Sequence, residues 1–399
     1  MDLWIIWYDL AQTLLGACAR ARTGYWFLTS LICFTIRSDL LGVTSFVRTL
    51  GLKPFFYDRL LDFFHSSSLC LEKLTALWVS IVLRRFPLIQ RNGRILLLGD
   101  GLKVPKSGRK MPAVKKLHQE SDNNSKPEYI FGHSCQAVGV LAGTGKNAFS
   151  VPLTARISEG VVFSNRHHFT LLDKMVVLPS ATLPIPLPYY FVADAYYACR
   201  TIIQGLLAQG QHLVSRVRMN SVAYELPLPE SRKRRGRKKI YGLKIKLKTL
   251  FNDVSAMTVI DSPLPEEQGI KLRVKVVDLI WRRVGILIRF VAVNHPVRGK
   301  ILLMTTDLSL TVAMIIEIYS LRFKIEVSFK QALRTLGAFL YHFWMKSMKK
   351  MRRKSGNQYL HRETPSYRAN VVLKLSAYHR FIQVGLVAQG LLQYLSCQY

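Results

Sequence analysis

Two short apolar runs, each followed by an aspartate, constrain the fold of this chain most strongly. The run "RILLLGDG" sets Asp100 between two glycines, and "YYFVADAYYACRTI" sets Asp194 before a helix-like segment. A short, wholly apolar run is typical of a strand buried inside a sheet, and the residue that ends it emerges at the sheet edge, where loops carry function. The sequence therefore predicts an α/β fold with an acidic side chain at the end of each of two buried strands.

A third acidic residue lies in "IYSLRFKIEVSFK", residues 318–330. At about 100° per residue, four polar side chains of this segment fall within about 80° of one another on one face of a helix. They are Tyr319, Arg322, Glu326 and Lys330. A lone carboxylate between two cations on an amphipathic helix is open to two interpretations: an intrahelical ion pair or a functional site.

The residue pattern changes several times along the chain and predicts five segments. Apolar residues with helical spacing occupy the first 90 positions, and two later strand-like runs are expected to pair as a hairpin across "TGKN". A β-rich stretch precedes the helix of Glu326, and Asp307 or Ser309 is the expected N-cap of that helix. The expected segments are a helical N-terminal domain (1–92), the first part of the α/β core (93–221), a mainly β insertion with a basic run (222–308), the core helix with Glu326 (309–345) and a basic, helical C-terminal segment (346–399).

The charge balance indicates a polyanionic partner. Lys and Arg number 57 against 24 Asp and Glu, a formal net charge of +33, and nucleic acid is the usual partner of such a chain. A ribosomal-type basic protein and an anionic membrane surface are the alternatives. The six cysteines are scattered without metal spacing, which favours a reducing cytoplasm, and the apolar run 25–36 is too short to span a bilayer.

Carboxylates from separate elements of a rigid scaffold suit metal-dependent phosphoryl transfer. Mg²⁺ prefers carboxylate and phosphate oxygens, and two such ions can act on the attacking and leaving oxygens. Each acid taken alone is a weak signal: Asp100 could be a turn residue, Asp194 a helix cap, and Glu326 a partner of Arg322 and Lys330. The order strand–Asp, two strands, helix, strand–Asp, strand, insertion and helix–Glu is far more specific, and it is the order of a ribonuclease-H-like core.

The same segments, together with the stretch 99–134, resemble the DDE transposases of bacterial insertion sequences. The resemblance covers about 35–395 and favours the branch with a β-rich insertion before the glutamate and the signature Tyr-x2-Arg-x3-Glu-x6-Lys. It implies Asp100, Asp194 and Glu326 as catalytic and metal-binding residues, with Mg²⁺ (or Mn²⁺), two ions in all, as cofactor. One position departs from the signature, because Leu333 stands where the Lys is expected and Lys330 lies earlier on the same face.

The resemblance implies cleavage of double-stranded DNA at transposon ends and transfer of the freed 3′-OH into target DNA. The two ends must be held together, so we expect a homodimer on DNA, associated with the bacterial nucleoid. Two other classes stay open: a ribonuclease-H-like nuclease such as a resolvase, and a decayed or domesticated DNA-binding protein. The expected DNA contacts are Tyr319, Arg322, Lys330, Arg232, Lys233, Arg234, Arg235, Arg237, Lys238, Lys239, Lys349, Arg352 and Arg353.

A group of acids and histidines flanks the first aspartate, namely His118, Glu120, Glu128 and His133. Their spacing fits no standard zinc site. We therefore expect them to support the site or to contact DNA.

Overall fold

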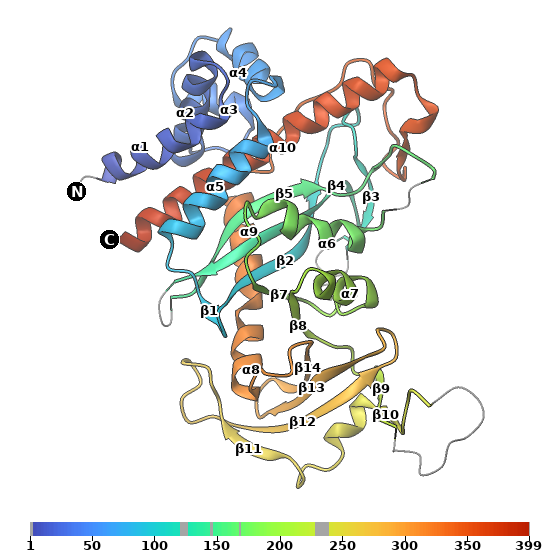
Figure 1. Cartoon of the computed structure of the whole chain (residues 1–399). Helices are drawn as coiled ribbons and strands as arrows, with labels where there is room; N and C mark the ends of the chain where they lie inside the picture. The colour runs from blue at the N-terminus through green and yellow to red at the C-terminus, as the bar shows by residue number, and fades with distance from the viewer. Residues whose placement is uncertain (1–2, 120–126, 144–146, 167–168, 228–238, 399) are drawn as a thin grey trace.

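A computed structural model describes residues 3–119, 127–143, 147–166, 169–227 and 239–398 of the chain. Within these residues a 13-stranded mixed sheet runs through most of the molecule, with helices packed around one half of it (Figure 1). The fold is therefore mixed α/β, as the sequence predicted.

The sheet combines a parallel centre with antiparallel flanks. Strand β2 (Arg94–Pro105) is parallel to β7 (Tyr189–Ala193), which is parallel to β8 (His212–Arg216). On one side, β2 pairs antiparallel with β4 (Tyr129–Ala142), and β4 pairs with β3 (Lys115–His118) and with β5 (Phe149–Ile157). The pairing of β4 with β5 confirms the predicted hairpin.

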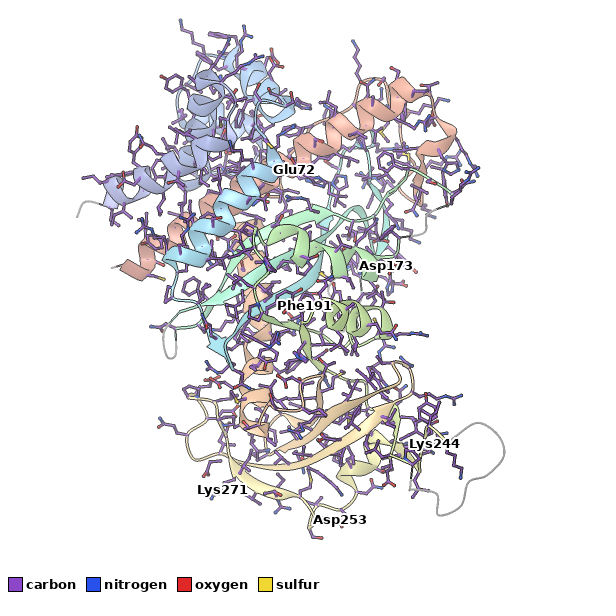
Figure 2. The ribbon with its side chains drawn as sticks, in the orientation of Figure 1. Glu72, Asp173, Phe191, Lys244, Asp253 and Lys271 are labelled. Atoms are coloured by element: carbon purple, nitrogen blue, oxygen red, sulfur yellow. The ribbon has the colours of Figure 1, made fainter. Side chains whose placement is uncertain are left out.

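The β-rich stretch continues this sheet. Strand β14 (Gly299–Thr305) pairs antiparallel with β8, with Leu303 opposite Arg216, and so joins the β-rich stretch to the parallel centre. Lys271 begins the long strand β12 in this half of the molecule (Figure 2). The remaining strands of this half are β9 (Val222–Tyr224), β10 (Lys244–Lys246), β11 (Thr258–Asp261), β12 (Lys271–Trp281) and β13 (Ile286–His295).

The central strands are buried because of their apolar sequence, and one glycine is essential to their packing. All five residues of β7 are buried. Phe191 of β7 lies in the interior (Figure 2), and a Cβ atom at Gly99 would lie 2.1 Å from its Cζ atom. Any side chain at Gly99 would displace this ring, so the glycine before Asp100 leaves room for Phe191 to pack against β2.

Ten α-helices are present in the described residues. The first five lie together at the N-terminal side of the molecule, and α10 packs against four of them and against β5 (Figure 1). None of the described helices is long and apolar enough to cross a membrane. The helices are α1 (Leu3–Leu14), α2 (Ala21–Ile36), α3 (Val43–Thr49), α4 (Phe56–His65), α5 (Leu71–Arg85), α6 (Leu171–Thr182), α7 (Arg200–Ala208), α8 (Val312–Ser320), α9 (Lys324–Arg334) and α10 (Pro365–Gln398).

Aromatic rings bind the N-terminal helices to the end of the chain. Phe381 of α10 lies 5.0 Å, centroid to centroid, from Phe34 of α2 and from Phe64 of α4. The buried Arg37 guanidinium stands over the rings of Phe34 and Phe46, and donates hydrogen bonds to the carbonyls of Gly42 and Leu336. The latter bond ties the N-terminal helices to the chain just after α9.

Three local predictions were wrong in detail. Asp100 does not end its strand, because β2 continues to Pro105 through its pairing with β4. The helix of Glu326 is divided by a 3₁₀ turn (Leu321–Phe323) that separates α8 from α9. Its N-cap is Thr311, whose hydroxyl accepts a hydrogen bond from the Met314 amide, and not Asp307 or Ser309. Asp307 instead accepts hydrogen bonds from the amide and hydroxyl of Ser309, a local turn that competes with capping.

Candidate active site

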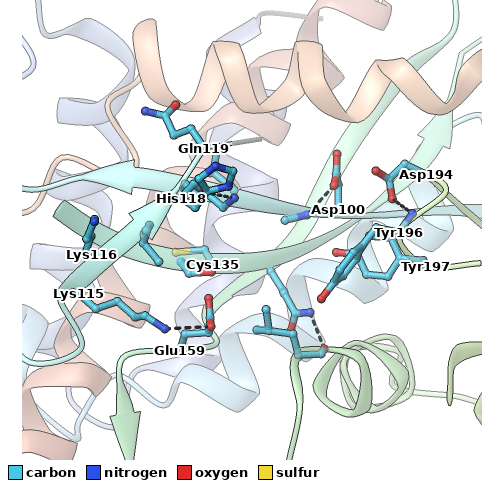
Figure 3. A pocket seen from close by; sticks show the side chains of 17 residues that line it. Asp100, Lys115, Lys116, His118, Gln119, Cys135, Glu159, Asp194, Tyr196 and Tyr197 are labelled. Carbon is cyan, nitrogen blue, oxygen red and sulfur yellow. Dashed lines mark hydrogen bonds and ion pairs between the residues drawn. The ribbon is translucent and has the colours of Figure 1, made fainter. Parts of the chain in front are cut away.

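Two aspartates meet where the parallel pairing of the central sheet stops. The register sets Leu98 of β2 opposite Val192 of β7, so Asp100 and Asp194 follow two residues later on neighbouring strands. There β7 ends, and the Asp194 carboxylate accepts a hydrogen bond from the amide of Tyr196. The Asp100 carboxylate accepts one from the amide of Gly101. Both aspartates line the same cavity (Figure 3).

The third acid reaches this point from helix α9, which packs against β2 and β5. Arg322, in the 3₁₀ turn before the helix, connects it to the first aspartate. The guanidinium lies 3.5 Å from the Asp100 carboxylate and donates a short hydrogen bond to the Glu326 carboxylate. The structure therefore brings Asp100, Asp194, Arg322 and Glu326 together, although 226 positions separate the first from the last.

The clustered acids perturb one another electrostatically. Burial, with a smaller contribution from the charges of Asp194 and Glu326, raises the pKa of the Asp100 carboxyl to about 6, although the Gly101 amide and Arg322 act to lower it. Burial also raises the pKa of the half-buried Tyr319 hydroxyl; the charge of Arg322 acts to lower this pKa, and the charges of Asp194 and Glu326 act to raise it. The site thus concentrates negative charge that a cation would relieve.

The acids offer hard oxygen ligands, but they are not arranged as a closed metal site. Among the described residues, no group of three or more His, Cys, Asp and Glu side chains stands close enough to hold a metal ion. Asp100 and Asp194 fit a divalent cation in chemistry and position. The Glu326 carboxylate is turned to Arg322 and must leave it to become a third ligand.

A cavity of about 560 Å³ opens beside the aspartates. In Figure 3 the acids lie at one end of it and the cations of strand β3 at the other. Sequence reasoning missed most of this lining; its one signal was the basic stretch "VKKLHQ", which contains strand β3 beside β4. The missed residues include Lys103, Lys115, Lys116, Gln136, Tyr196 and Tyr197.

The four residues flanking the first aspartate separate in the structure. His118 lines the cavity, 3.7 Å from the Glu128 carboxylate. His133 is fully buried and makes hydrogen bonds to the Tyr341 hydroxyl and the Pro112 carbonyl, so it supports the fold and cannot contact DNA. Glu120 lies outside the described residues.

The predicted DNA contacts outside the carboxylate cluster are mostly exposed. Lys330, Lys349, Arg352, Arg353 and Lys239 all face solvent. The rest of the predicted basic run, 232–238, lies outside the described residues. A second, smaller cavity of about 210 Å³ is lined by Tyr319, Arg322 and several side chains of the β-rich stretch, among them Glu267 and His295.

Comparison with known proteins finds one family model that matches the central part of the chain. Residues 151–344 match the family model described as the transposase DDE domain. The matched segment contains Asp194, Arg322 and Glu326 and begins after Asp100, which the sheet register brings beside Asp194. No curated protein matches the chain.

Proposed function

From the match of residues 151–344 to the transposase DDE domain family, we propose that the protein cuts DNA at the ends of a mobile element and joins the freed 3′-OH to target DNA. The convergence of Asp100, Asp194 and Glu326 from two strands and a helix carries the proposal. The core would be ribonuclease-H-like, of the branch whose β-rich insertion precedes the glutamate.

We assign Asp100 and Asp194 to hold divalent Mg²⁺ or Mn²⁺ from neighbouring strands, with Glu326 added from α9. When bound, the ions would stabilise the charge that develops on the attacking and leaving oxygens of the phosphodiester. The strands fix the two aspartates, so their carboxylates need little reorganisation. Glu326 is 55% exposed and sits in the first turn of its helix, so it is free to turn from Arg322 toward the aspartates.

The cations around the acids would position DNA. Once Glu326 has turned away, the Arg322 guanidinium can bind a phosphate beside the scissile one, because its planar fork matches phosphate oxygens. Lys330 lies one helical turn further on and is exposed, so it can supply the charge that the signature expects at Leu333. The +33 net charge would hold the duplex on both sides of the site.

We assign the segments of the chain as follows: 1–92 to contacts with the DNA ends, 93–221 and 309–345 to the catalytic core, 222–308 to an insertion and 346–399 to backbone contacts. Two ends must be cut and joined together. We therefore expect a homodimer in the DNA complex.

A plasmid cleavage assay tests the proposal. The substrate is supercoiled plasmid carrying the DNA that flanks the gene, incubated with Mg²⁺, Mn²⁺ or EDTA. The wild type should nick at fixed positions only with metal. Asp194→Asn and Glu326→Gln should lose at least a hundredfold of this activity and keep DNA binding. Glu266→Gln, an exposed glutamate in the β-rich stretch, should cut like the wild type.

The products separate the competing functions. Joined end–target molecules support a transposase, whereas cutting of branched DNA without joining supports a resolvase. A wild type that binds DNA but never cuts with either metal supports a non-catalytic binding protein. An Asp194→Asn variant that cuts normally would refute the role assigned to that residue.

A further inference from the structure

Two strongly basic segments far apart in the sequence lie side by side at the end of the cavity away from the aspartates. Residues 103–119 carry six Lys and Arg, residues 340–358 carry six more, and neither segment contains an acid. Lys115 is paired with the Glu159 carboxylate (3.2 Å) and Lys106 is buried, but the other ten cations have no carboxylate within either segment and repel one another. A polyanion that lies across both segments would relieve this repulsion.

Hydrogen bonds hold the two segments together in spite of this repulsion. These bonds occur at several points along both segments, so the positions of the charged residues are fixed relative to one another. The bonds are Met345 N to Lys110 O (2.8 Å), Met351 N to Arg109 O (2.8 Å), Lys116 N to Ser355 O (2.8 Å), Arg109 Nε to Met351 O (2.7 Å) and Lys110 Nζ to Lys346 O (3.1 Å). We call the surface formed by residues 107–116 and 344–355 the two-loop surface.

An exposed tryptophan stands in this surface. Trp344 is 63% exposed, whereas Trp78 and Trp281 are buried in the core. Its indole lies against Gly108, where an added Cβ would come within 2.8 Å of the indole Nε1. One edge of the ring is thus packed on the neighbouring loop while the rest faces solvent. An aromatic ring presented in this way among cations is the usual platform for stacking an unpaired base.

The two-loop surface is connected to the carboxylates by the cavity. Lys115 and Lys116 of β3 line the cavity at the end away from Asp100 and Asp194 (Figure 3). The amide of Lys116 bonds the carbonyl of Ser355, so the cavity wall and the second basic segment are adjacent. A strand that leaves the aspartates would therefore reach the two-loop surface through the cavity.

We propose that the two-loop surface binds single-stranded DNA continuing from the cleavage site, with one unpaired base stacked on Trp344 and phosphates on Lys349, Arg352 and Arg353. The inference rests on the proposed function and specifies its substrate. A base inside a duplex is covered by its neighbours and cannot stack on the ring. The tryptophan therefore selects a single strand, while the cations bind any DNA backbone.

Fluorescence anisotropy in EDTA tests the proposal on the full chain. The probes are a labelled 20-nucleotide single strand and the same strand in a duplex. Trp344→Ala should bind the single strand about tenfold more weakly, because one stacked base contributes about that much. Its duplex binding should stay within twofold. Trp344→Phe should recover most of the loss. The triple change Lys349→Ala, Arg352→Ala, Arg353→Ala should weaken the binding of both probes. The slope of log K against log salt concentration should become less steep by the amount expected for the loss of about three phosphate contacts.

Two control variants test the location. Trp4→Ala removes another exposed tryptophan, in α1, and Lys271→Ala with Arg273→Ala removes two exposed cations from β12. Both should bind the single strand like the wild type. Thermal melting establishes that each variant is folded. The proposal fails if Trp344→Ala binds the single strand normally, or if both probes weaken equally.

The assay contains no metal, so it does not depend on cleavage. If the protein never cuts DNA but Trp344→Ala weakens single-strand binding, the proposed cleavage function is refuted and single-strand binding by the two-loop surface is supported. If the protein cuts DNA but Trp344→Ala binds the single strand normally, the cleavage function is supported and single-strand binding by the two-loop surface is refuted.

Discussion

The Arg322 guanidinium lies 3.5 Å from the Asp100 carboxylate, at the point where the acids of the site converge. It also bonds Glu326, so one cation neutralises two of the three proposed metal ligands. Arg322 is 19% exposed, which strengthens these contacts relative to a pair in water. Cation binding and release of Arg322 should therefore be linked.

Removing Arg322 should strengthen divalent-cation binding in the absence of DNA. The Arg322→Gln variant leaves Asp100 and Glu326 without their neutralising partner, so Mn²⁺ should bind about tenfold more tightly, equivalent to about 1.4 kcal/mol. Electron paramagnetic resonance of free Mn²⁺ measures this directly. Arg334→Gln, at the far end of α9, is the matched control and should bind like the wild type. An unchanged affinity for Arg322→Gln would show that the arginine does not compete with the ion.

Lys330 should account for the phosphate contact that the signature assigns to position 333. Leu333 is half-buried and packs against the main core, whereas Lys330 is exposed. Lys330→Ala should weaken duplex binding several-fold and lower the salt slope by about 0.9. Leu333→Lys should add little affinity for the duplex, because the aliphatic part of the new lysine side chain would have to leave the core for its ammonium group to reach a phosphate. Binding isotherms at several salt concentrations would contradict this if Leu333→Lys tightened binding and Lys330→Ala did nothing.

Arg37 should contribute strongly to stability although it lies far from the acids. Replacement by Met leaves the carbonyls of Gly42 and Leu336 without their charged donor, while the apolar volume is kept. The free energy of unfolding should fall by about 2–3 kcal/mol, as expected for hydrogen bonds to a charged group. Urea denaturation measures the change. Arg48→Met, which removes an exposed ion pair with Asp39, should change stability by less than about 1 kcal/mol.

His133 should make the fold sensitive to acid. Burial lowers the pKa of its imidazole to about 3, against about 6.5 in an unfolded chain. Between these values only the unfolded chain takes up the proton, so stability falls as the pH drops from about 6.5 toward 3. In His133→Gln this dependence should be shallower by about 1.4 kcal/mol per pH unit. Urea titrations at pH 5, 6 and 7 measure the slope, and identical slopes for both proteins would contradict the assignment.

The sequence predicted best those elements that local pattern determines. The apolar runs before Asp100 and Asp194 are indeed buried strands. The predicted hairpin forms from β4 and β5, and a helix, α7, follows Asp194 as expected. The end of β2 was misjudged because its continuation depends on pairing with β4, which the run itself does not encode. The helix N-cap was misjudged because three polar residues near position 310 compete for it.

The site was only partly predictable, for a physical reason. The three acids could be proposed from their positions along the chain, but the contact of Arg322 with Asp100 depends on how α9 packs against β2. The two-loop surface is a still clearer case. Its segments are separated by more than 200 residues, and only tertiary hydrogen bonds such as Met351 N to Arg109 O bring them together.

The long final helix has a consequence for biosynthesis. Because α10 packs on α1, α2, α4 and α5 as well as on β5, helices made first by the ribosome gain their main partner only after residue 365 has been translated. Contacts of such sequence separation form late and slowly. The chain would thus complete its fold only near the end of translation, and a prematurely terminated product would be a substrate for proteolysis.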